Sequence, residues 1–148
     1  METALSEDVV WCLRALAQEA SVQRALYPSF AVVADELVLD FDDAYSGYKQ
    51  THQTQHDDLE SLDALIESKS GILEYWTSEA LEQSEFWREI RRRATDALKA
   101  RSLTTDAPSP SSNLFVSEQE TWISGRTKHR QPNDRPSSFI TKLLKLFR

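Results

Sequence analysis

With 148 residues, of which 40% are apolar and 28% charged, the chain has the length of one domain with a modest core. Its three glycines and five prolines are too few for the tight turns of an all-β protein, so helices are favoured. A single cysteine, Cys12, excludes an intramolecular disulfide and a cysteine-cluster metal site, and no apolar run is long enough to cross a bilayer.

The net charge of −7 is divided unevenly along the chain. Residues 1–87 hold 18 Asp and Glu against 4 Lys and Arg, whereas residues 88–148 hold 6 against 13. Such an acidic first part repels nucleic acid and attracts basic protein surfaces. The first residues, METALSEDVV, show neither the basic nor the apolar part of a signal peptide, so we expect a cytoplasmic location.

The first predicted helix runs from about Ser6 to Ala20. Ser6 is a good N-cap, two acidic residues follow it where the helix dipole favours them, and apolar residues recur at helical spacing. Cys12 lies within this apolar pattern, which predicts a buried thiol rather than a reactive one. A second, short helical turn starts at Ser21 and ends before Pro28, because the residue before a proline is disfavoured in the α region.

The segment from Phe30 to Tyr48 has the densest mixture of apolar and acidic residues and is predicted to be the central helix. At about 100° per residue, eight residues fall on one apolar side: Phe30, Val33, Ala34, Leu37, Phe41, Ala44, Tyr45 and Tyr48. Of these, we expect Leu37 and Phe41 to be nearly inaccessible to solvent. The opposite side is acidic and supplies the first candidates for partner binding: Asp35, Glu36, Asp42 and Asp43. Asp40 lies at the edge of the apolar side, where an acid pairs with a buried cation or caps a neighbouring backbone.

A polar connection, Thr51–His56, follows the central helix, and a third helix begins at Asp57 or Asp58. His52 and His56 are four residues apart with these two acids next to them, a spacing with which a zinc or nickel site can begin. The neighbouring Thr and Gln residues and the lack of a second ligand cluster favour a solvated loop instead. We therefore expect no metal and no cofactor, and we add Asp57 and Asp58 to the acidic partner-binding residues.

Two further helices are predicted before residue 102. Thr77 and Ser84 are suitable N-caps for a short helix and a long one. The long helix places apolar residues on one side: Trp87, Ile90, Ala94, Ala97 and Leu98. Its three adjacent arginines, residues 91–93, spread around most of the circumference, so we expect them to pair with the acidic first half rather than to bind nucleic acid. The predicted fold class is all-α, a compact bundle of four or five helices over residues 1–102.

The composition changes after residue 102. Residues 103–137 form a predicted linker, rich in Pro and Ser at Thr104–Asn113, with a short segment, Leu114–Ile123, that can dock as a strand or turn. Residues 138–148 predict an amphipathic basic helix at the end of a flexible C-terminal tail. Its docking stripe is apolar: Ile140, Leu143, Leu144 and Phe147. Because cations flank this stripe, the helix suits an acidic protein surface first and an anionic membrane second.

No motif in the chain specifies a reaction. The acids of the central helix share one helix, whereas paired-carboxylate catalysis needs two carboxyl groups in different environments across a cleft. Gly47, Gly71 and Gly125 are far apart, so the sequence has no phosphate-binding loop and no dinucleotide fingerprint. We therefore expect a protein that is not an enzyme and that acts by binding another protein.

Two stretches, FAVVADELVLDFDDAY and WTSEALEQSEFWREIRRRATDAL, resemble segments of small acidic helical bacterial proteins of the toxin-immunity type. The resemblance covers about residues 5–101 and implies an immunity or inhibitor protein that binds one toxin domain and blocks it. A basic toxin domain is then the expected partner of the acidic residues. Two alternatives stay open: a regulatory or adaptor protein that acts through residues 138–148 on a partner or membrane, and a metal-dependent hydrolase that uses the histidine pair.

Overall fold

Six α-helices account for most of the chain that the structure, a computed structural model, describes: residues 4–111, 115–116 and 121–122. In chain order the elements are α1 (Glu7–Ala17), α2 (Ala20–Ala25), α3 (Val33–His52), α4 (Asp57–Ser68), the 3-10 helix η1 (Leu73–Tyr75), α5 (Ser78–Gln83) and α6 (Glu85–Ala100). Strands β1 (Phe115–Val116) and β2 (Thr121–Trp122) form an antiparallel pair. The all-α prediction is confirmed, and the six-residue helices α2 and α5 raise the number of helices above the four or five predicted.

Side-chain caps determine where three of the helices begin. Ser6, Thr77 and Ser84 each accept a hydrogen bond from the backbone N–H three residues later, at 3.4, 3.0 and 3.2 Å. Each bond satisfies one of the N–H groups that the start of a helix leaves without an intrahelical partner. All three caps were predicted from the sequence. Helix α4 ends at Ser68, and Gly71, with a φ of 84°, lies in the turn that follows.

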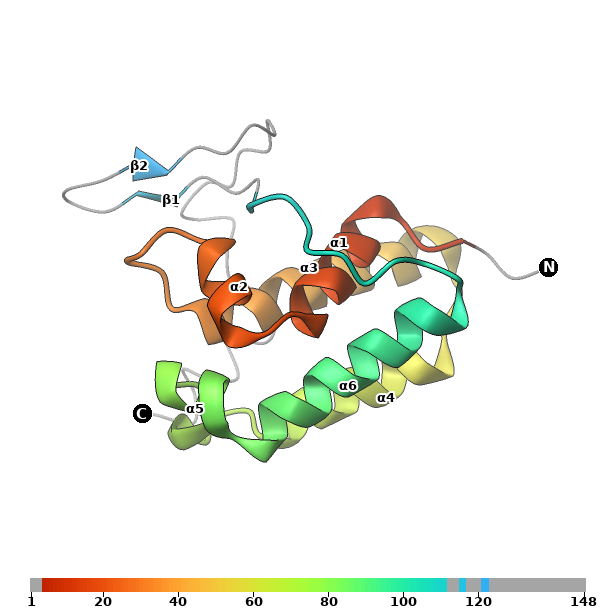
Figure 1. The fold of residues 1–148 in the computed structure, drawn as a ribbon. Helices are drawn as coiled ribbons and strands as arrows, with labels where there is room; N and C mark the ends of the chain where they lie inside the picture. Colours follow the sequence, from red (N-terminus) through yellow and green to blue (C-terminus); the bar gives the residue numbers. More distant parts are fainter. Residues whose placement is uncertain (1–3, 112–114, 117–120, 123–148) are drawn as a thin grey trace.

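Helices α1 and α3 form one layer of the bundle and α4 and α6 form the other, with α1 packed on both α3 and α6 (Figure 1). The core contains Leu37 and Phe41 of α3, which are 1% and 0% exposed, as predicted. Trp87 of α6 is also fully buried, and its indole N–H donates to the carbonyl of Tyr75 at 2.8 Å. The thiol of Cys12 is buried in this core, which confirms the prediction for it.

Helix α3 is buried around more of its circumference than the sequence predicted. Val38 and Leu39, both outside the predicted apolar side, are buried, and α3 contacts both α1 and α5. The four acids predicted on the outer side of α3 are each partly exposed, so this side is less open to solvent than the sequence predicted. Asp40 is buried, and its Oδ2 accepts a hydrogen bond of 2.7 Å from the Tyr27 hydroxyl. Burial, together with this carboxylate, raises the pKa of Tyr27 well above its usual value.

Residues 103–111, here called the strap, leave α6 and run along α1 (Figure 1). The indole N–H of Trp11 donates to the Ser109 carbonyl at 2.8 Å, and the side-chain amide of Gln18 donates to the Thr105 carbonyl at 2.9 Å. Most residues of the strap are exposed, yet polar side chains of α1 donate to its carbonyls and hold it along that helix, which its composition did not predict.

Most of the predicted tail lies outside the described residues. Strands β1 and β2 fall within Leu114–Ile123, the segment for which a strand or turn was predicted. The helix predicted at residues 138–148 lies outside, and so does its docking stripe: Ile140, Leu143, Leu144 and Phe147. Within the described part of the chain, no helix combines the length and the apolar composition that crossing a bilayer requires.

Candidate protein-binding surface

Acidic residues outnumber basic ones twofold in residues 4–111, which contain 20 Asp and Glu and 10 Lys and Arg. Six of these cations form ion pairs within the chain: Arg24 with Glu82, Lys49 with Glu60, Arg88 with Glu85, Arg92 with Glu89 and Asp96, Arg93 with Glu89, and Arg101 with Asp58. Arg14 and Arg91 donate to backbone carbonyls, and Lys69 lies over the Tyr75 ring. Nine of these ten cations are thus engaged by the chain itself, and the acids exceed the cations available to them.

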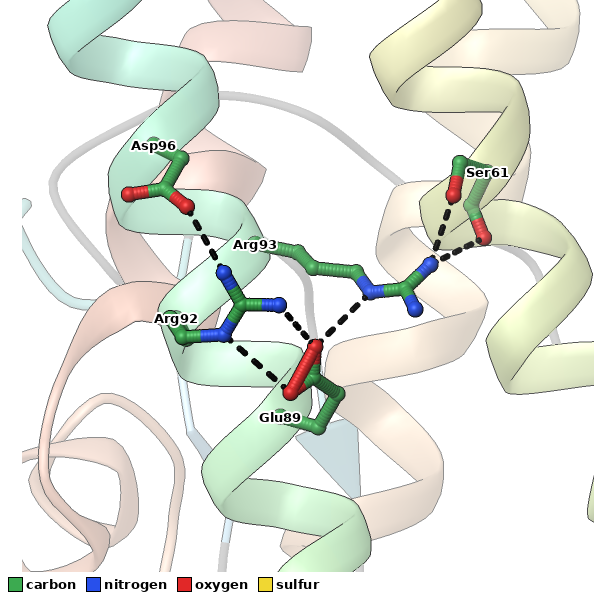
Figure 2. A network of polar contacts seen from close by, with 5 residues as sticks. All are labelled: Ser61, Glu89, Arg92, Arg93 and Asp96. Carbon is green, nitrogen blue, oxygen red and sulfur yellow. Dashed lines mark hydrogen bonds and ion pairs between the residues drawn. The ribbon is translucent and has the colours of Figure 1, made fainter.

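Figure 2 shows one such network on α6. The Glu89 carboxylate accepts hydrogen bonds from Arg92 and Arg93, which lower its pKa to about 2. Arg92 Nη1 also reaches Asp96 Oδ2 at 3.1 Å, and Arg93 Nη1 donates to Ser61 Oγ at 2.6 Å, which joins α6 to α4. The carboxylates paired with Arg92 and Arg93 belong to α6, whereas the sequence predicted pairing with the acidic first half.

Arg91 has a different role from its two neighbours. Its partly buried guanidinium donates to the Gln18 carbonyl at 2.8 Å, to Gln23 Oε1 at 2.9 Å and to the Leu81 carbonyl. Burial lowers the pKa of Arg91. Gln23 is fully buried, and its amide donates to two carbonyls near the end of α1. Arg91 therefore connects the α1–α2 turn, α5 and α6, a role that a run of three arginines in the sequence does not reveal.

The predicted partner-binding acids lie in a strip along α3 and at the start of α4. Asp35 and Asp42 are seven residues apart, as are Glu36 and Asp43, so each pair lies on one side of α3, two turns apart. At a rise of about 1.5 Å per residue, these four carboxylates cover about 12 Å of the helix. Asp57, in the first turn of α4, is exposed. These six acids of α3 and α4 are here together called the acidic strip.

Two acids of the strip have environments that set them apart. Asp58 forms a two-point ion pair with Arg101, with N–O distances of 2.7 and 2.9 Å, and the hydrogen bond from Arg101 lowers the pKa of Asp58. Asp35 is partly buried, and its Oδ1 has no hydrogen-bond partner among the described residues. Burial, with a smaller contribution from Glu36, raises the pKa of Asp35 to about 6. Asp58 is thus already used within the chain, and the Asp35 carboxyl is mostly ionised only above about pH 6.

His52 and His56 lie on the two sides of the turn between α3 and α4. His52 Nδ1 is 3.1 Å from the Tyr48 carbonyl, and His56 Nε2 is 3.1 Å from the Tyr48 hydroxyl. The backbone N–H of His56 donates to the Tyr45 hydroxyl at 3.2 Å. His56 is 5% exposed, so the solvated loop expected here is wrong for this residue, which packs among tyrosines. Among the residues that the structure describes, no three His, Cys, Asp or Glu side chains are grouped to hold a metal ion.

An apolar groove that the sequence did not predict, here called the α2–α5 groove, has a volume of about 680 Å³. Residues of α2, of the connection to α3, of the first turn of α3 and of the segment around α5 line it: Arg24, Ala25, Tyr27, Pro28, Ser29, Ala31, Val32, Val33, Ala34, Trp76, Thr77, Ser78 and Leu81. The predicted central helix began at Phe30, whereas α3 begins at Val33, so the preceding apolar residues form a groove wall. The sequence feature that could have indicated this groove wall is the apolar run FAVV, residues 30–33, directly after a proline-containing turn.

Comparison with protein-family models, with curated proteins and with solved structures gives no match for this chain. Two described surfaces can carry a function, the acidic strip and the α2–α5 groove. Both are of kinds that bind proteins or peptides, because an acidic strip attracts a basic surface and an apolar groove accepts apolar side chains.

Proposed function

We propose that this is a non-catalytic protein-binding protein, and specifically an immunity or inhibitor protein that neutralises a toxin domain. The main support is the acid surplus of residues 4–111, whose cations are largely engaged by the chain's own groups. A surface with such a surplus speeds association with a basic partner and makes the complex sensitive to salt. The partner that fits best is therefore a basic toxin domain, bound in the cytoplasm.

Asp42, Asp43 and Asp57 are the acids proposed to contribute most to the contact. Asp42 and Asp43 lie in the middle of the strip, and Asp57 is exposed at the start of α4. Asp58 already holds Arg101 at 2.7 Å, so releasing it to a partner would leave the guanidinium without its carboxylate. Its contribution is to the negative field that attracts the partner rather than to a direct contact.

The test starts with the tagged full chain as bait in the cell that makes it, and mass spectrometry identifies the copurified partner. Binding of the purified partner is then measured at several salt concentrations for the wild type and for the triple variant Asp42→Asn, Asp43→Asn, Asp57→Asn. We expect a partner with a basic surface and an affinity that falls steeply as salt rises. The triple variant should associate markedly more slowly, because it loses three charges from the proposed contact.

A matched control variant, Glu7→Gln, Glu19→Gln, Glu74→Gln, removes the same charge from exposed acids outside α3 and α4. It should associate faster than the triple variant. Equal association rates for the two variants would contradict the proposed position of the contact, and an affinity insensitive to salt would contradict the electrostatic mechanism. Loss of the partner's toxic activity in a one-to-one complex would distinguish an immunity protein from other binding proteins.

The second candidate is a regulatory or adaptor protein that acts through residues 138–148 on a partner or membrane. It is favoured by the sequence of that segment, in which cations flank an apolar stripe. A partner that binds the wild type and the triple acid variant equally, but loses binding on Leu144→Asp, would support this function and contradict the first.

A further inference from the structure

The α2–α5 groove has room for large apolar side chains of an incoming segment. Its volume of about 680 Å³ lies within the range of about 300–1,000 Å³ for pockets that enclose whole ligands. Val32, which lines it, is 56% exposed, and Phe30, between two lining residues, is 37% exposed. Exposed apolar side chains that gather at a groove mark an interaction site more often than scattered ones do.

The strap ends at the edge of this groove. The backbone N–H of Ser111, a residue only 1% exposed, donates to the Leu26 carbonyl at 2.8 Å. Leu26 stands between two residues that line the groove. Ser111 therefore lies beside the groove, and 26 residues, which include strands β1 and β2, lie between Ser111 and Ser138. The 15 residues between Trp122 and Ser138 can span up to about 50 Å, which is enough for residues 138–148 to reach the groove.

The chemistry of residues 138–148 matches that of the groove. The segment has apolar residues at positions i, i+3, i+4 and i+7, the spacing with which a helix binds a groove: Ile140, Leu143, Leu144 and Phe147. Three cations flank this stripe: Lys142, Lys145 and Arg148. Acidic residues directly follow lining residues on both walls of the groove: Asp35 after Ala34, Glu79 after Ser78, and Glu82, which pairs with the lining Arg24, after Leu81. The segment therefore offers both the apolar surface and the charge of opposite sign that the groove requires.

We propose that Ser138–Arg148 docks as an amphipathic helix in the α2–α5 groove of the same chain, and this proposal does not rest on the toxin binding proposed above. A helix of 11 residues is too short to be stable alone in water, so its folding depends on the groove. Tethering gives the segment an effective concentration in the millimolar range, above that of a second copy in dilute solution. An anionic membrane is a poorer surface for it, because the acidic body would have to approach the same negative potential.

Disulfide trapping in the full chain tests this docking. The groove variant carries Val32→Cys with Leu144→Cys, and the control variant carries Ser46→Cys, at an exposed position of α3, with the same Leu144→Cys. The native Cys12 is buried and is kept in both. Under mild oxidation at low protein concentration, we expect the groove variant to form an intramolecular disulfide about tenfold faster, a ratio that corresponds to about 1.4 kcal/mol.

A third variant adds Phe147→Asp to the groove variant. It should form the disulfide at the control rate, because the substitution places a charge in the apolar stripe of the docking segment and leaves the helical bundle unchanged. Equal rates for the groove and control variants would overturn the proposal. A disulfide-linked dimer at low protein concentration would place the segment on a second copy and also overturn it. Cosedimentation with phosphatidylserine–phosphatidylcholine vesicles, together with disulfide formation at the control rate, would assign the segment to a membrane instead.

Discussion

Replacing Arg91 by methionine tests whether its partly buried guanidinium holds α6 against the α1–α2 turn and α5. The substitution keeps most of the apolar length of the side chain and removes the donors to Gln18, Gln23 and Leu81. A buried acceptor that is left unsatisfied costs about 1–3 kcal/mol. Because the site is partly exposed, water replaces some of the lost bonds, and we expect the free energy of unfolding to fall by about 2–4 kcal/mol.

The assay for Arg91→Met is urea denaturation followed by far-ultraviolet circular dichroism. Arg92→Met is the matched control, because the Arg92 side chain is 60% exposed and pairs with acids of its own helix (Figure 2). Exposed pairs of this kind contribute little to stability, so the control should unfold close to the wild-type midpoint. If both variants unfolded at the same urea concentration, the structural role assigned to Arg91 would be refuted.

Four further substitutions test the core, the acidic strip and the strap. Leu37→Ala and Phe41→Ala should each lower the free energy of unfolding by about 2–5 kcal/mol, whereas Leu73→Ala, at a residue 64% exposed, should change it little in the same urea assay. The pKa of Asp35 is about 6 in the folded protein against an ordinary 3.8, so the folded state binds more protons in this range and stability falls as the pH rises through it. Asp35→Asn should therefore stabilise the protein at neutral pH by about 1–2 kcal/mol after allowance for partial exposure, and it should not stabilise the protein at about pH 4. Thermal unfolding at the two pH values measures this difference, with Asp57→Asn as the control. Trp11→Phe should speed cleavage of the strap by proteinase K, because it removes the hydrogen bond to Ser109 and keeps most of the ring surface; an unchanged cleavage rate would contradict this.

Local features of the fold were predictable because residues close in the sequence determine them. Ser6, Thr77 and Ser84 cap helices through N–H groups only three residues away. The inward side of α6 followed from apolar spacing, and all five residues predicted there are buried. Helix α3 shows the limit of this reasoning. Val38 and Leu39 are buried because other helices cover more than one side of α3, and periodicity within one helix does not report how many sides its neighbours cover.

Contacts between distant segments were not predictable. Asp58 was expected to face a partner, but the structure pairs it with Arg101, 43 residues later. The strap was expected to be a linker because its composition offers little apolar burial, yet the indole N–H that holds Ser109 belongs to Trp11, 98 residues earlier. The composition of a segment indicates how much apolar surface it can bury. It does not indicate which hydrogen-bond donors other helices supply to its backbone. The acids of the candidate site could thus be named from the sequence, whereas their ion pairs and the groove beside them required the fold.

The acidic strip and the α2–α5 groove meet at the start of α3. Ala34 lines the groove, and Asp35 and Glu36 follow it directly in the chain. A basic segment docked in the groove therefore places cations near these two carboxylates and weakens the field that they present to a basic partner. Asp42 lies about 10 Å further along the helix than Asp35, and Asp57 lies on α4 beyond the far end of α3. Both carboxylates are therefore distant from the docked cations and still attract a basic partner. When the segment is docked, the negative field of the protein is consequently strongest at the middle of α3 and the start of α4. A basic partner that is also to contact the first turn of α3 has to displace the segment.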